Sequence, residues 1–160
     1  MNIALLIIDV QKAFISHRKG QEEYDRTFDY INHTAFLFRE KNKPVIVIRD
    51  LANGDDENYQ NADELATDEK DIEVIKYYGN GFWKTDLEEI LKKLEVDFVV
   101  LCGNAAEYCV LATYNGAMER GFGAAMLQNG IFAASRTGLE DIAFNRSVIS
   151  HQVISYILSE

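Results

Sequence analysis

The chain has 160 residues, 48% of them hydrophobic, which is enough for one globular core and excludes the disordered and fibrous classes. Sixteen basic residues stand against 26 acidic ones, and the formal net charge of −10 argues against nucleic acid or an anionic membrane as a partner. We therefore expect residues 1–160 to form a single domain that acts on a small molecule.

The N-terminal segment is apolar for a few residues from Ile3 until Asp9 interrupts it. It has no basic stretch and no small-residue cleavage site, and it is too short to span a bilayer. The only cysteines are Cys102 and Cys109, which argues against a disulfide scaffold. These features predict a cytoplasmic protein in which one thiol can be reactive.

Four short segments rich in Ile, Val and Leu predict buried strands, because continuous apolarity is what a parallel sheet covered on both faces requires. Helical patterns lie between and after them. In chain order we expect strands at residues 3–8, 44–49, 97–102 and 123–127, and helices at residues 22–41, 85–94, 107–120 and 146–158. This alternation predicts a doubly wound α/β fold, with a mostly parallel sheet and helices on both faces in a Rossmann-like three-layer arrangement.

Residues 51–71 interrupt the regular pattern. The segment is acidic and weakly periodic, and it is longer than most loops in compact domains. A mobile lid, a contact for a partner and a solvated insertion are all consistent with this composition.

Two charged residues stand where apolar segments end, which is where doubly wound sheets bind ligands. Asp9 directly follows the first strand, and its carboxylate is either a functional group or a cap for the next turn. Lys76 follows the apolar run at 72–75 and, taken alone, is more typical of a surface lysine. Lys84 competes with it, but a cation just before a helix is mildly unfavourable and is expected to point to solvent.

Cys109 is the most specific candidate. It falls in the first turn of the helix expected at 107–120, where free N–H groups and the helix dipole lower the pKa of a thiol. The same amides can stabilise a tetrahedral oxyanion. Inert buried cysteines are common, and Cys102, at the end of an apolar strand, is expected to be one of them.

Three motifs occur in order along the chain: IIDVQKAF, KYYGNGFWKTDL and VVLCGNAAEYCVLAT. Their key residues are Asp9, Gln11 and Phe14 in the first, Lys76, Phe82, Thr85 and Leu87 in the second, and Gly103, Cys109 and Val110 in the third. Together, over most of the chain, they resemble the isochorismatase-like cysteine hydrolase family, which includes nicotinamidases and N-carbamoyl amidohydrolases. The spacing in the second motif selects Lys76 over Lys84.

The resemblance implies a triad of Cys109, Asp9 and Lys76 that cleaves a C–N bond of a small amide, ureido or carbamoyl substrate through a thioester. Asp9 would accept the thiol proton and return it, while Lys76 would favour the thiolate and orient the carboxylate. The family pattern also implies a cis peptide bond between Asn104 and Ala105. The oxyanion would lie against the backbone N–H groups of Ala105 and Cys109.

Three side chains are expected from the resemblance to contact the substrate: Gln11, Phe14 and Phe82. Trp83 and Tyr108 could add to an aromatic pocket for a planar amide. Aromatic residues at such spacings are more often part of a core, and the resemblance supports Phe14 most clearly among them. Since relatives are often dimers or tetramers, we also expect a homo-oligomer.

The chain departs from the metal-binding nicotinamidase branch, which holds its ion with an Asp and two His after the second strand. Asp50 is present here, but no histidine occurs between His33 and His151. One carboxylate is a poor site for a transition metal. We therefore expect no metal and no other cofactor, and ordinary nicotinamidase activity is disfavoured.

The cysteine loop departs from the family as well, at Asn104 and Ala106, and so does Asn129 after the next strand. These changes leave the substrate class open. They also motivate an alternative function, a catalytically inactive binding or assembly module on the same fold. A dinucleotide-binding domain is disfavoured, because the turn after the first strand lacks the glycines that a pyrophosphate needs.

Overall fold

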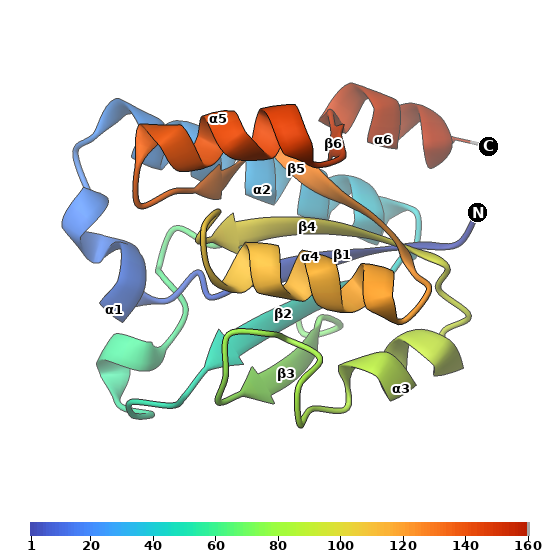
Figure 1. Ribbon diagram of the computed structural model, residues 1–160, viewed down its shortest axis with the longest axis horizontal. Coiled ribbons are helices and arrows are strands. Elements are labelled where there is room, and N and C mark those ends of the chain that lie inside the picture. The colour runs from blue at the N-terminus through green and yellow to red at the C-terminus, as the bar shows by residue number, and fades with distance from the viewer. Residues whose placement is uncertain (160) are drawn as a thin grey trace.

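The computed structural model describes residues 1–159, and within them one six-stranded sheet runs through the molecule in the order β3-β2-β1-β4-β5-β6 (Figure 1). Every neighbouring pair of strands is parallel. The strands are β1 (Ile3–Ile8), β2 (Val45–Asp50), β3 (Ile72–Lys76), β4 (Phe98–Asn104), β5 (Gly123–Phe132) and β6 (Val148–Ile149). The predicted doubly wound α/β class is confirmed.

Helices cover both faces of the sheet, and the two faces have separate cores (Figure 1). The helices are α1 (Lys12–Ile15), α2 (Glu22–Glu40), α3 (Leu87–Lys93), α4 (Cys109–Glu119), α5 (Arg136–Asn145) and α6 (His151–Ile157), with 3-10 turns η1 (Ser16–Arg18) and η2 (Glu57–Tyr59). Residues of α3, α4 and α5 pack on one face, and residues of α1, α2 and α6 on the other.

Strand β1 shows why its sequence is apolar without alternation. Its even-numbered residues, Ala4 to Ile8, pack in the core under α3 and α4, while its odd-numbered residues, Ile3 to Ile7, pack against α2. All six side chains are fully buried. A central strand of a parallel sheet has two apolar faces, because successive side chains point to opposite sides.

The C-terminal part of the chain differs from the prediction. The helix expected at 146–158 is wrong in its first half, where Val148 and Ile149 instead pair with β5 as an edge strand. Helix α6 begins only at His151, because the hydroxyl of Ser150 accepts the N–H of Val153 and caps it. Helices α1 and α5 and the strand β3 are further elements that the sequence pattern does not predict.

The strand order reverses between β1 and β4, so the carboxyl ends of these two neighbours form the switch point at which such sheets bind ligands. Gly103 lets β4 approach β1 there. Its φ is +109°, and a Cβ added to it would lie 2.1 Å from the carbonyl oxygen of Ile8. No helix within residues 1–159 has the length and apolarity needed to cross a bilayer.

The acidic segment at 51–71 packs against the protein. The N–H of Ala62 donates to the carbonyl of Val10, and the N–H of Lys12 donates to the carbonyl of Gln60. Ala62 and Leu65 are buried in the same core as α2. The segment therefore lies against the loop that follows β1, next to the switch point.

Candidate active site

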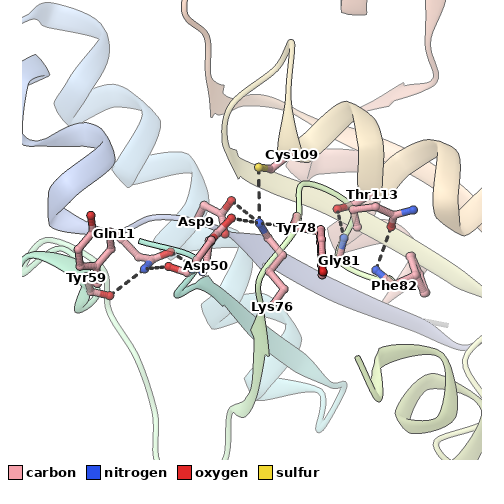
Figure 2. Close-up of polar contacts among 12 residues, drawn as sticks. Asp9, Gln11, Asp50, Tyr59, Lys76, Tyr78, Gly81, Phe82, Cys109 and Thr113 are labelled. Carbon is pink, nitrogen blue, oxygen red and sulfur yellow. Dashed lines mark hydrogen bonds and ion pairs between the residues drawn. The ribbon is translucent and has the colours of Figure 1, made fainter. Parts of the chain in front are cut away.

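The ammonium of Lys76 is the centre of a buried polar cluster at the carboxyl ends of the strands (Figure 2). Lys76 ends β3 and is 0% exposed. Its Nζ lies 2.9 Å from Oδ2 of Asp9 and 2.9 Å from Oδ2 of Asp50. It also donates to the carbonyl of Tyr78 at 3.0 Å and to Sγ of Cys109 at 3.5 Å.

Asp9 reaches this cluster because the chain turns sharply at the end of β1. Its φ is +51°, in the left-handed region, and its N–H still donates to the carbonyl of Ile48 on β2. The side chain is 2% exposed. One carboxylate oxygen accepts from Lys76, while Oδ1 is buried without a hydrogen-bond partner among residues 1–159.

Cys109 is the first residue of α4, and its thiol is half-buried. One ligand atom from each of Asp9, Asp50 and Cys109 lies within 4.8 Å of the other two. The structure therefore brings together the three residues of the expected triad. Cys102, by contrast, is fully buried, and its thiol contacts the carbonyl of Leu6.

Burial sets the protonation states of the cluster. It raises the pKa of the Asp9 carboxyl to about 6, against the opposing charge of Lys76. Burial also raises the pKa of the Cys109 thiol to about 12, with Asp9 adding to the effect and Lys76 opposing it. The expectation that the helix start lowers this pKa is wrong, because desolvation and the neighbouring carboxylate outweigh it.

The charge of Lys76 is retained in spite of its burial. Burial alone lowers the pKa of the ammonium, but Asp9, Cys109 and Asp50 together outweigh it and hold the pKa above its usual value. At neutral pH the cluster thus contains a thiol, an ammonium and an ionised Asp9.

The loop before α4 is rigidly held and offers free amides. The peptide bond between Asn104 and Ala105 is cis. The N–H of Ala106 donates to the carbonyl of Phe132, and the carboxylate of Glu107 accepts the N–H groups of Ala134 and Ser135. Among the described residues, 1–159, the backbone N–H groups of Ala105 and Cys109 have no acceptor, as an oxyanion site requires.

Gln11 does not occupy the position expected for a substrate contact. It is 0% exposed, and its Nε2 donates to the carbonyls of Asp50 and Tyr59 at 2.9 and 2.8 Å. Its Oε1 accepts the N–H of Asp50 at 2.8 Å. Gln11 thus joins the ends of β1 and β2, and both hydrogens of its buried amide are already donated within the protein.

The aromatic candidates separate into three environments. Phe82 is in the core and stacks on Phe122 with ring centroids 6.0 Å apart, so it does not line the site. Trp83 and Tyr108 are exposed. Phe14 is half-buried and packs edge-on against Tyr59, and its role as a substrate contact stays a prediction.

The sequence suggests Asp50 only as a metal ligand, and one that is insufficient alone. In the structure its carboxylate accepts a hydrogen bond from the ammonium of Lys76. Asp9, Asp50 and Cys109 form the only group of at least three candidate metal ligands within residues 1–159. The ammonium already contacts all three side chains, so a metal ion would compete with it for the same atoms. These residues do not fit a metal site while Lys76 is charged.

A sizeable cavity of the described chain lies away from this cluster. It has a volume of about 660 Å³ between α2, β5 and α5, and Asp9, Lys76 and Cys109 do not line it. The candidate site is therefore defined by its chemistry and its place at the switch point, not by the size of a cavity.

Known proteins share the sequence pattern and the fold of this chain. YecD of Escherichia coli O157:H7, an uncharacterised isochorismatase family protein, is 28% identical over 151 residues, which cover 82% of this chain and 80% of YecD. N-carbamoylsarcosine amidase from Thermoplasma acidophilum has the same fold, with a TM-score of 0.83 at 23% identity, covering 94% of this chain and 97% of the amidase chain. The zinc complex of pyrazinamidase from Pyrococcus horikoshii gives a TM-score of 0.78 at 20% identity, covering 94% of this chain and 99% of the pyrazinamidase chain.

The family itself is shown by the sequence. Residues 3–156 match the family model of the isochorismatase domain, which covers almost the whole chain. The resemblance first carried by three short motifs thus extends through the complete sheet and its helices. This chain belongs to the isochorismatase family.

Proposed function

We propose that this protein is a cysteine hydrolase that cleaves a C–N bond of a small amide, ureido or carbamoyl compound. The observation that carries the proposal is the convergence of the Cys109 thiol, the Asp9 carboxylate and the Lys76 ammonium at the switch point. Two structural neighbours, by their names, are amidases, which supports C–N cleavage as the reaction type.

The first half-reaction begins with attack by Sγ of Cys109 on the substrate carbonyl carbon. Asp9 takes the thiol proton through the oxygen that Lys76 leaves free, so no separate thiolate has to form in the resting site. The carbonyl oxygen becomes an oxyanion against the N–H groups of Ala105 and Cys109. Collapse of the tetrahedral species breaks the C–N bond, and protonated Asp9 donates its proton to the leaving nitrogen.

The second half-reaction regenerates the thiol. Water attacks the thioester carbonyl carbon while Asp9 accepts its proton, and the same two amides stabilise the second oxyanion. The C–S bond then breaks, the acid leaves, and the proton on Asp9 returns to sulfur. Lys76 stays protonated throughout and keeps Asp9 ionised in spite of its burial.

A panel of uncharged and charged amides, ureides and carbamoyl compounds tests the proposal, with ammonia release as the readout. Cys109→Ala should lower turnover by at least about 100-fold, since the nucleophile is lost. Cys102→Ala is the matched control, because this thiol is buried in the core away from the cluster and its loss should leave turnover nearly unchanged.

Turnover by a folded Cys109→Ala variant would refute nucleophilic catalysis by this residue. No ammonia from the wild type across the panel, together with an intact fold, would favour the alternative of a binding or assembly module.

A further inference from the structure

A second carboxylate contacts Lys76, and the mechanism above does not use it. Oδ2 of Asp50 lies 2.9 Å from Nζ, the same distance as Oδ2 of Asp9. The other oxygen, Oδ1, accepts the N–H of Ala52 at 2.8 Å, so both oxygens of Asp50 are held. This side chain is mostly buried beside a wholly buried lysine.

The backbone of Asp50 is fixed as firmly as its side chain. Gln11, which is wholly buried, accepts the N–H of Asp50 and donates to its carbonyl. Asp50 also lies directly opposite Lys76 in the register of β2 and β3. Its contact with the ammonium is therefore a built feature of two adjacent strand ends and not a chance meeting of flexible surface groups.

The second carboxylate changes the charge of the centre. Asp9 and Asp50 contribute two negative charges against the single positive charge of Lys76, while Cys109 is a neutral thiol. The cluster carries one negative charge in excess, in a shielded site where charges act more strongly than in water.

Among residues 1–159, no basic side chain other than Lys76 lies within ion-pair distance of Asp9 or Asp50, and three others in neighbouring segments do not neutralise the excess. Two of them are already paired with acidic side chains. Lys12 pairs with Glu57 and Asp63, and Arg49 pairs with Glu73 and Asp55. The third, Lys84, is exposed, and its Nζ lies 5.3 Å from the ring centroid of Tyr78, where solvent screens it.

We infer that Asp50 is a positioning residue that acts through Lys76, and that the negative charge it adds makes the site select uncharged amides and ureides over substrates with a carboxylate near the scissile bond. The inferred substrate class rests on the proposed function. The weaker approach of anionic reagents to Cys109 does not depend on it. A carboxylate several Å from an uncompensated charge should be disfavoured by about tenfold.

Alkylation of Cys109 tests this without turnover. Iodoacetamide and iodoacetate differ mainly in charge, and both react by forming an S–C bond with loss of iodide, while the thiol proton passes to Asp9 and then to solvent. The rates at Cys109 are followed by peptide-resolved mass spectrometry, and their ratio is divided by the ratio for glutathione. We expect the wild type to prefer iodoacetamide by about tenfold beyond glutathione.

Asp50→Asn should reduce this preference to within about threefold of glutathione, because it removes one charge at nearly constant shape. Asp55→Asn is the matched control, since it removes an equal charge from an exposed residue that pairs with Arg49 and not with Lys76. It should keep the wild-type ratio within about twofold. Asp50→Glu retains the charge and should retain the preference.

Three results would overturn the inference. They are an unchanged ratio in folded Asp50→Asn, a loss of preference in both Asp50→Asn and Asp50→Glu, and a failure of both reagents to label Cys109 in the wild type. The amide panel tests the proposed function separately: preference at Cys109 without turnover leaves the charge inference standing and removes the proposed function. Turnover without a preference for iodoacetamide at Cys109 supports the proposed function and overturns the charge inference.

Discussion

Lys76 holds only one oxygen of Asp9: its Nζ lies 2.9 Å from Oδ2, while Oδ1 has no partner among residues 1–159. The Lys76 ammonium holds the Asp9 carboxylate in place through Oδ2. Oδ1 stays available to accept the proton of the Cys109 thiol. Both side chains are almost wholly buried, so this contact is shielded from water.

The pH dependence of turnover should follow Asp9. Its pKa is about 6, and it must be ionised to accept a proton, so kcat/KM should rise with pH around a midpoint of about 6. A plateau should then extend to about pH 10, because the thiol pKa is about 12 and the ammonium pKa lies above its usual value. Initial rates at low substrate concentration measure this profile. A midpoint at 9.0, the ordinary value for cysteine, would instead indicate attack by a free thiolate.

Removal of the ammonium should destabilise the fold. Lys76→Met leaves two buried carboxylates without a counterion, and the free energy of unfolding should fall by about 3–5 kcal/mol in urea titrations. Adding Asp50→Asn to this variant should restore part of the loss, since one of the like charges is gone. Lys84→Met, at an exposed site, serves as the control. Equal stability of the Lys76 and Lys84 variants would contradict the ion cluster.

Gly103→Ala should be among the most damaging substitutions. The new Cβ would meet the carbonyl oxygen of Ile8 at 2.1 Å, and the residue would also have to keep a φ of +109°. We expect a loss of more than about 3 kcal/mol. Gly121→Ala separates the two causes, because Gly121 also has a positive φ but no atom within 4 Å of the added carbon. It should cost about 1 kcal/mol, and equal thermal shifts would rule out the steric explanation.

Gln11→Leu tests the link between the strand ends. It would leave the part-buried N–H and carbonyl of Asp50 without this partner and take one of two donors from the carbonyl of Tyr59, which Arg49 also contacts, at a cost of about 2–4 kcal/mol. Hydrogen exchange should also become faster in the segment around η2. Gln128→Leu, on the exposed part of β5, should leave both quantities unchanged. Normal protection around η2 in the Gln11 variant would show that this side chain is not what holds the segment.

Much of the fold could be predicted because its central strands are apolar on both faces. Strand β1 has the predicted bounds, and β2 and β4 begin within a residue of theirs. The family resemblance of the three motifs grouped Asp9, Lys76 and Cys109, and all three lie at the edge of the sheet where the strands have their carboxyl ends. Their catalytic roles, the homo-oligomer and the cytoplasmic location stay predictions.

The missed elements have weak local signals. Strand β3 buries only Val74 and Lys76, and the latter is a polar residue that no hydrophobic pattern includes. Strand β6 has two residues, and α5 buries only Gly138 and Ile142. Their structure depends on tertiary contacts, which local periodicity does not record.

The roles of Asp50 and Gln11 were missed for a related reason. Gln11 bonds to Asp50, 39 positions away, and this pairing depends on the register of two strands. One signal was available, however. Asp50 ends β2 and Asp9 directly follows β1, and because these strands are adjacent and parallel, both carboxylates lie at the same edge of the sheet. The raised pKa of the Cys109 thiol could not be predicted either, because it results from burial in the folded protein.

The side chains of the cluster come from the ends of β1, β2 and β3 and from the residue that opens α4. These side chains lie on segments that are far apart in the sequence, so a partly folded chain does not assemble the cluster. The proposed turnover should therefore require pairing of the strands from β3 to β4. During refolding, catalysis should therefore recover only after these strands have paired, later than helical signals that form locally. The proposed activity would therefore serve as a measure of how far the sheet has formed.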